Sequence, residues 1–146
     1  MKKKVKKNRK KSNRGKLIKG ILENVPAESF DILYSEIEEL LRGNSGIYVL
    51  YNSDEIYYIG LAKDLKGRLL THFDRSRHKG KWNKFSVYII KNIDYLKDLE
   101  TLLLRIVKPN GNRISGNVPK EARLTEKLKK TISKLRKSIK SIEKVI

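Results

Sequence analysis

Cysteine is absent from this chain of 146 residues, and histidine occurs only twice. The absence of cysteine excludes disulfides, thiolate nucleophiles and zinc sites of the cysteine type. With only two imidazoles available, any bound metal ion is expected to prefer oxygen ligands. Long apolar runs are also missing, so the sequence predicts neither a membrane span nor a secretory signal. These absences favour a cytoplasmic protein with a single domain.

Acidic residues are scarce relative to basic ones, because 16 Asp and Glu face 35 Lys and Arg. The resulting net charge of +19 is concentrated at the two ends of the chain. Residues 1–19 carry eleven basic side chains and no acid, residues 120–146 carry ten against three, and residues 20–119 are nearly neutral. Polycationic ends bind polyphosphate in a salt-sensitive way, which predicts a nucleic-acid partner and no membrane. A localisation signal or a solubilising tail is the alternative.

The composition divides the chain into a basic tail, a helix, a central domain and a second helix. These segments are residues 1–19, 20–44, 45–114 and 115–146. The tail is predicted to be disordered because it has almost no apolar side chains. The first helix is predicted with Asn24 as its N-cap, Pro26 in its first turn and Gly43 just past its end. Its apolar stripe consists of Phe30, Leu33, Tyr34, Ile37, Leu40 and Leu41.

The C-terminal helix carries apolar residues at alternating spacings of four and three. They are Leu128, Ile132, Leu135, Ile139, Ile142 and Ile146. This heptad-like seam has three possible uses. It could pack on the domain's own core, extend as an arm that contacts DNA, or pair with a second copy to form a homodimer.

The most informative pattern is a pair of tripeptides, Gly46-Ile47-Tyr48 and Tyr58-Ile59-Gly60. Each places a tyrosine in a strand-like run, and the residues between the two runs have turn chemistry. The pattern predicts a β-hairpin with strands 46–51 and 56–60 that holds two phenols side by side. Because tyrosine is common in strands, the tripeptides alone are weak evidence of function.

A polar set follows the hairpin. Arg68 and His72 lie four residues apart, on one face of a short helix predicted after Asp64. An arginine fork can stabilise charge on a phosphate during attack. A tyrosine beside a cation can act as a general base if a histidine accepts its proton.

Glu100 interrupts the apolar face of a further helix, predicted over residues 94–107 after a third strand at 85–91. The positions that share its face are Leu96, Leu103, Leu104 and Val107. A carboxylate on such a face is costly unless it is paired or bound to a cation. The partner could be Arg68, Arg105 or a divalent metal ion.

Together these residues resemble the GIY-YIG nuclease family over residues 45–113. Both namesake tripeptides are present, Arg68 follows Gly60 by eight residues, and His72 follows Arg68 by four. A Glu, an aliphatic run, Lys-Pro and an Asn then follow between Leu99 and Asn112. The resemblance implies an α+β fold with a small three-stranded antiparallel sheet flanked by helices, which agrees with the elements predicted above.

The resemblance also implies a phosphodiester hydrolase that uses one Mg²⁺ or Mn²⁺ ion. Glu100 would hold the metal ion, Tyr48 would activate the attacking water, and Arg68 would clamp the scissile phosphate. Tyr58 and His72 would assist in hydrogen bonding and proton relay, and Asn112 would orient the site.

The polar stretch 74–84 is predicted to be an exposed loop that grips DNA, which we expect to be double-stranded. Its candidate contacts are Arg75, Arg77, Lys79, Lys81 and Lys84. Trp82 would either stack on a base or cap the core, and the core is favoured. The alternative to an endonuclease is a nucleic-acid-binding protein that uses this fold as a catalytically inactive scaffold.

Overall fold

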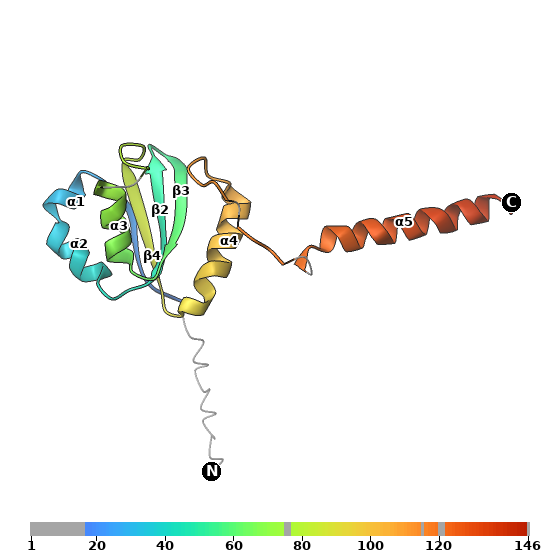
Figure 1. The fold of residues 1–146 in the computed structure, drawn as a ribbon, viewed down its shortest axis with the longest axis horizontal. Helices are drawn as coiled ribbons and strands as arrows, with labels where there is room; N and C mark the ends of the chain where they lie inside the picture. Colours follow the sequence, from blue (N-terminus) through green and yellow to red (C-terminus); the bar gives the residue numbers. More distant parts are fainter. Residues whose placement is uncertain (1–16, 75–76, 115, 120–121, 146) are drawn as a thin grey trace, which may run out of the picture.

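A four-stranded antiparallel sheet forms the centre of the protein (Figure 1). The computed structural model describes residues 17–74, 77–114, 116–119 and 122–145. The strands are β1 (Ile18–Pro26), β2 (Gly46–Asn52), β3 (Glu55–Ala62) and β4 (Lys84–Ile90), in the spatial order β1-β4-β2-β3. Strand β3 is therefore one edge of the sheet.

Helices cover both faces of this sheet. The covering helices are α1 (Ser29–Ile32), α2 (Tyr34–Leu41), α3 (Leu65–Asp74) and α4 (Leu96–Val107), with the 3-10 turn η1 (Ile93–Tyr95) before α4. A further helix, α5 (Leu124–Glu143), extends away from the sheet (Figure 1). Figure 1 shows α1, α2 and α3 on one face and α4 on the other. Because successive strand residues point to opposite faces, Tyr48 and Leu50 enter the cluster beneath α3, whereas Ile47 and Val49 pack towards α4.

The segment at residues 20–44 corrects the sequence-based prediction of a single helix. Its first part is strand β1, which adds a fourth strand to the predicted three and also takes in Ile18 and Lys19 from the predicted tail. Asn24 is not a helix N-cap: it has a φ of 54° at an irregularity in the pairing with β4, and its N–H donates to Ser86 Oγ over 2.9 Å. Asparagine tolerates this left-handed conformation better than most residues.

The rest of that segment contains two short helices instead of one. Leu33, at φ −106° and ψ 25°, separates α1 from α2. Of the predicted apolar stripe, Phe30, Ile37 and Leu41 are buried. Gly43, at φ 68°, lies just past the end of α2, as the sequence predicts.

Other elements follow the predicted pattern. The two tyrosine-bearing strands pair as a hairpin, with Tyr48 opposite Gly60. Asp64 caps α3, where its Oδ1 accepts the N–H of Gly67 over 3.1 Å. Within the part of the chain that the structure describes, no helix is long and apolar enough to cross a membrane. The first 16 residues of the predicted basic tail lie outside the described residues.

Candidate active site

The glycines of the two tripeptides make room for the site. Tyr48 on β2 lies directly opposite Gly60 on β3, and a Cβ at Gly60 would overlap the Tyr48 phenol. A Cβ at Gly46 would likewise collide with the carbonyl oxygen of Tyr88 on β4. The phenol of Tyr48 therefore lies flat against a strand that offers no side chain at that point, with its ring centroid 5.9 Å from that of Tyr58.

Tyr48 is hydrogen-bonded to both predicted site residues of α3, Arg68 and His72. Its hydroxyl oxygen lies 2.7 Å from His72 Nε2 and accepts the Nε–H of Arg68 over 3.2 Å. The four-residue spacing on α3 places Arg68 and His72 on the same side of the phenol, as predicted. Tyr48 and His72 are fully buried, whereas Arg68 is exposed to solvent.

Burial controls the protonation of this network. Desolvation raises the pKa of Tyr48 above its usual value, and the neighbouring Arg68 guanidinium only partly offsets this effect. Desolvation also lowers the pKa of His72 to about 4, helped by the positive charge of Arg68. At neutral pH the phenol is therefore protonated and the imidazole is neutral.

Glu100 approaches the site from the opposite face of the sheet. It lies on α4, and its Oε1 accepts the N–H of Leu61, at the outer edge of β3, over 3.3 Å. Desolvation raises its pKa, against the lowering effects of the Leu61 N–H and of the Lys97 and Arg68 charges. None of the ion pairs between described residues includes Glu100, so neither Arg68 nor Arg105 is its salt-bridge partner.

Asn112 fixes the loop after α4 to the same edge of β3. Its Oδ1 accepts the N–H of Ile59 over 2.9 Å, and its Nδ2 donates to the carbonyl oxygen of Ile59 over 2.6 Å. The N–H of Gly111 donates to the carbonyl oxygen of Tyr57 over 2.7 Å. The loop thus satisfies backbone groups that an edge strand would otherwise leave open.

Three of the predicted residues, Tyr58, Glu100 and Asn112, line one cavity of about 390 Å³. Arg77, Lys97 and Arg113 also line it, so the cavity that contains Glu100 has several basic residues in its walls. Arg68 lines an adjacent depression with Leu61, and Tyr48 and His72 lie buried. The six predicted residues therefore gather around β3 from both faces of the sheet.

The residues that could hold a metal ion are few. In the described ranges, no group of three or more His, Cys, Asp and Glu side chains is arranged to hold one. The second carboxylate oxygen of Glu100, Oε2, makes no hydrogen bond to a described residue. A hard carboxylate oxygen at a cavity is a suitable ligand for Mg²⁺ or Mn²⁺, with water and substrate oxygens completing the shell.

The basic residues predicted to contact nucleic acid have different environments. Arg77 lines the cavity, and its Nη2 donates to the carbonyl oxygen of Gly111 over 3.3 Å. Lys79 and Lys81 are exposed, whereas Lys84 opens β4 and forms an ion pair with Asp54 at 2.8 Å. Arg75 lies outside the described residues.

Sequence reasoning missed two residues of the site, Tyr57 and His78. The loop at 74–84 was expected to be exposed, but His78 within it is buried. The Tyr57 hydroxyl and His78 Nδ1 lie 2.9 Å apart, and the His78 ring packs 4.4 Å from that of Tyr58. Trp82 packs in the core against Phe73, as favoured from the sequence. No periodicity in the loop marks His78, although histidine is rare in this chain.

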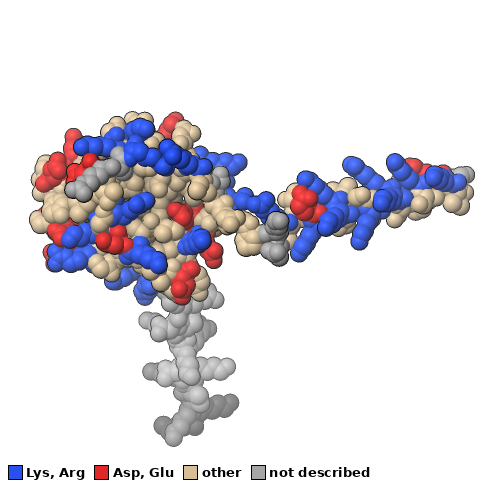
Figure 2. Space-filling model, viewed as in Figure 1, with Lys and Arg blue, Asp and Glu red and all other residues tan. Residues whose placement is uncertain are grey.

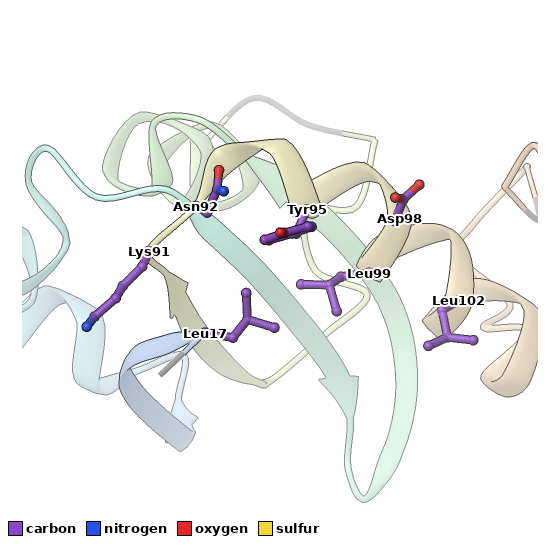
Figure 3. A pocket seen from close by; sticks show the side chains of 7 residues that line it. All are labelled: Leu17, Lys91, Asn92, Tyr95, Asp98, Leu99 and Leu102. Atoms are coloured by element: carbon purple, nitrogen blue, oxygen red, sulfur yellow. The ribbon is translucent and has the colours of Figure 1, made fainter. Parts of the chain in front are cut away.

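An apolar groove lies elsewhere on the protein. It has a volume of about 540 Å³ and contains none of the six predicted catalytic residues (Figure 3). Its lining consists of Leu17, Lys91, Asn92, Tyr95, Asp98, Leu99 and Leu102. The polar chemistry around β3 is therefore separate from this groove.

Residues 44–113 match the model of one protein family, described as the GIY-YIG catalytic domain. UvrABC system protein C of Thermosipho africanus (strain TCF52B) is 38% identical to this chain over 72 residues. That match covers 46% of this chain and 13% of the relative, so the chain corresponds to a small part of that protein.

Similar solved structures are those of the GIY-YIG N-terminal endonuclease domain of UvrC from Thermotoga maritima. The form bound to its catalytic divalent cation, magnesium, is 24% identical, with a TM-score of 0.48 over 56% of this chain and 97% of that chain. A point mutant bound to the catalytic divalent cation is 21% identical, with a TM-score of 0.49 over 57% of this chain and 98% of that chain.

Proposed function

We propose that the protein is a metal-dependent DNA endonuclease, because residues 44–113 match the model of the GIY-YIG catalytic domain. The observation that carries the proposal is the hydrogen-bonded network of Arg68, Tyr48 and His72, which lies across β3 from the carboxylate of Glu100. The reaction is hydrolysis of a phosphodiester bond, and double-stranded DNA is the substrate that the basic surface suits best.

Glu100 is the residue that would hold a Mg²⁺ or Mn²⁺ ion, through its Oε2, which makes no hydrogen bond to a described residue. Such an ion supplies Lewis-acid stabilisation of the charge that develops on the phosphate. Desolvation raises the pKa of Glu100 more than the Leu61 N–H and the Lys97 and Arg68 charges lower it, and a bound cation would stabilise the ionised carboxylate. Because Glu100 is the only acidic side chain among the described residues that line the cavity, the remaining ligands would be water and phosphate oxygens.

Arg68 is the residue that clamps the scissile phosphate. Its Nε–H is committed to Tyr48, and its exposed guanidinium leaves the Nη groups for phosphate oxygens. A planar fork fixed at one end binds a phosphate with defined orientation, which lysine cannot reproduce.

Tyr48 is the general base in this proposal. Its oxygen accepts a proton from the attacking water while its own proton passes to the neutral imidazole of His72. Tyr48 has no exposed surface, so water reaches its oxygen only after a neighbour moves. Tyr58 assists from the cavity side.

A plasmid-nicking assay tests this function. Wild-type protein should nick supercoiled DNA in Mg²⁺ or Mn²⁺ and not in EDTA. Arg68→Lys keeps the charge but loses the fork, and should lower the rate by about 100-fold. Arg105→Lys on the exposed surface of α4 is the matched control and should cut normally. Salt-sensitive binding without cutting in either metal would instead support the inactive scaffold.

A further inference from the structure

Helix α5 carries an apolar seam that the rest of the described chain leaves uncovered. Five of its apolar side chains are 40–60% exposed. They are Leu128, Ile132, Leu135, Ile139 and Ile142. The helix extends away from the sheet and its flanking helices (Figure 1), and no described helix or strand packs extensively against it. A seam of this length on a 20-residue helix requires a partner.

The spacing and identity of the seam residues specify the kind of partner. In a heptad repeat, Ile132 and Ile139 occupy the a positions, and Leu128, Leu135 and Ile142 occupy the d positions. Isoleucine at a with leucine at d favours parallel two-stranded coiled coils. The α5 seam follows this rule at two a positions and at two of the three d positions.

The charges that flank the seam are compatible with self-pairing in this orientation. The e positions are Lys129, Arg136 and Glu143, and the g positions are Thr131, Ser138 and Val145. In a parallel pair, each g residue faces the e residue five positions later on the partner helix. Arg136 then faces a threonine and Glu143 faces a serine, so no like charges oppose each other. An antiparallel pair would place Arg136 against its own counterpart.

Most of the positive charge of α5 lies away from the seam. The basic residues at the outer b, c and f positions are Lys127, Lys130, Lys134, Lys137, Lys140 and Lys144. Figure 2 shows Lys and Arg along much of this helix. Pairing along the seam would therefore leave these cations free for solvent or polyphosphate.

We propose that α5 pairs with α5 of a second copy of this chain as a parallel two-stranded coiled coil. The pair is a closed, two-fold symmetric interface in which each seam residue meets its own counterpart. The parallel orientation places the two preceding chain segments at the same end of the coil, and with them the two catalytic domains. If the proposed nuclease function holds, this arrangement brings two active sites to one DNA molecule.

The mass of the full chain in solution, measured across a concentration series without DNA or metal, tests the pairing independently of the nuclease function. Wild type should shift from monomer to dimer as concentration rises. Leu135→Ala removes a seam contact but keeps helix propensity, and should weaken the dimer at least tenfold. Lys137→Ala on the outer face should not weaken it. A wild-type chain that stays monomeric at every concentration would overturn the proposal.

The dependence of the dimer on salt concentration is a second test, because it should be opposite to that of DNA binding. Screening reduces repulsion between two chains of net charge +19, so added salt should strengthen the dimer, whereas it weakens binding to DNA. A dimer that dissociates as salt rises would contradict pairing through an apolar seam.

The orientation can be read from single cysteines, because the natural sequence has none. Thr125 is the a position at the start of α5 and meets its own counterpart only in a parallel pair. Thr125→Cys should therefore form a disulfide-linked dimer under mild oxidation, and Lys130→Cys on the outer face should not. A dimer by mass without the Thr125→Cys cross-link would refute the parallel orientation. Docking of α5 on the apolar groove of its own chain (Figure 3) would give a monomer and refute the pairing.

Discussion

The two neighbours of Tyr48 determine where its proton lies. Arginine can only donate, so the Arg68 Nε–H points at the phenol oxygen, and the phenol proton must point at His72 Nε2. This arrangement requires an unprotonated Nε2, which agrees with a His72 pKa of about 4. The site thus holds a neutral imidazole where a positive charge would repel Arg68.

His72 should titrate far below its usual pKa of 6.5. Because the folded state resists protonation, the contribution of His72 to stability is full above pH 6.5 and is lost as pH falls from 6.5 to 4. NMR of the imidazole should give a pKa near 4, and chemical unfolding should show the matching loss of free energy. His78, whose pKa is also lowered, contributes with the same sign. A His72 midpoint near 6.5 would contradict the buried network.

Gly60 should not tolerate a side chain. A Cβ there overlaps the Tyr48 phenol, so Gly60→Ala should destabilise the fold by about 1–3 kcal/mol and also lower nuclease activity. Gly20→Ala on β1 is the matched control, because its Cβ would meet Ile89 Cδ1 at an ordinary 3.5 Å. Thermal or chemical unfolding of the two variants compares them directly. Equal stability would show that the phenol does not lie against Gly60.

Helical spacing and hairpin register place four of the six predicted site residues, whereas Glu100 stands out on an apolar helix face and Asn112 follows only from the family resemblance. Tyr48 and Tyr58 follow from the strand pattern, and Arg68 and His72 follow from their four-residue separation. Tyr57 and His78 were not accessible, because their contact joins β3 to an irregular loop. Such a contact depends on loop geometry, and no period in the sequence encodes it.

At the scale of secondary-structure elements, Asn112 is predicted to hold the loop after α4 against β3. Asn112→Ala leaves the N–H and carbonyl of Ile59 without these partners and should cost about 1 kcal/mol or more of stability. Hydrogen exchange of the Ile59 amide should become faster. Asn117→Ala, which alters another residue of the same cavity lining, should leave that amide protected. If the Ile59 amide exchanged at the wild-type rate in both variants, the Asn112 side chain would not hold the loop after α4 against β3.

The hairpin was predictable because its apolar residues recur every second position. Helix α4 was predictable because its apolar residues recur every three to four positions. Strand β1 was misread because Asn24 and Pro26 favour a helix start, whereas in the structure they lie where β1 pairs irregularly with β4 and then ends. The alternation of β1 is weakened by Gly20, and its stability comes from pairing with β4, which is distant in sequence. The secondary-structure propensities of neighbouring residues cannot predict a pairing between strands that are distant in sequence.

At the scale of the whole molecule, the charge distribution predicts salt-sensitive DNA binding. The logarithm of the DNA-binding constant should fall linearly with the logarithm of the salt concentration between about 50 and 200 mM, because binding releases counterions from the DNA. Deletion of residues 1–16, which contain basic side chains and no acid, should reduce the slope. Fluorescence anisotropy with a labelled DNA duplex measures the slope for the full chain and for the chain without residues 1–16. An unchanged slope would show that this segment does not contact the DNA backbone.

The most direct test of the central claim is the nicking rate of Glu100→Gln in Mg²⁺, compared with that of Asp98→Asn on the same helix. Glutamine preserves the size of the side chain and the bond to Leu61, but it removes the anionic metal ligand. Glu100→Gln should lose about 100-fold or more of the wild-type rate while binding DNA normally. Asp98→Asn should cut at the wild-type rate. Metal-dependent cutting that survives Glu100→Gln would contradict the assignment of Glu100 as the metal ligand.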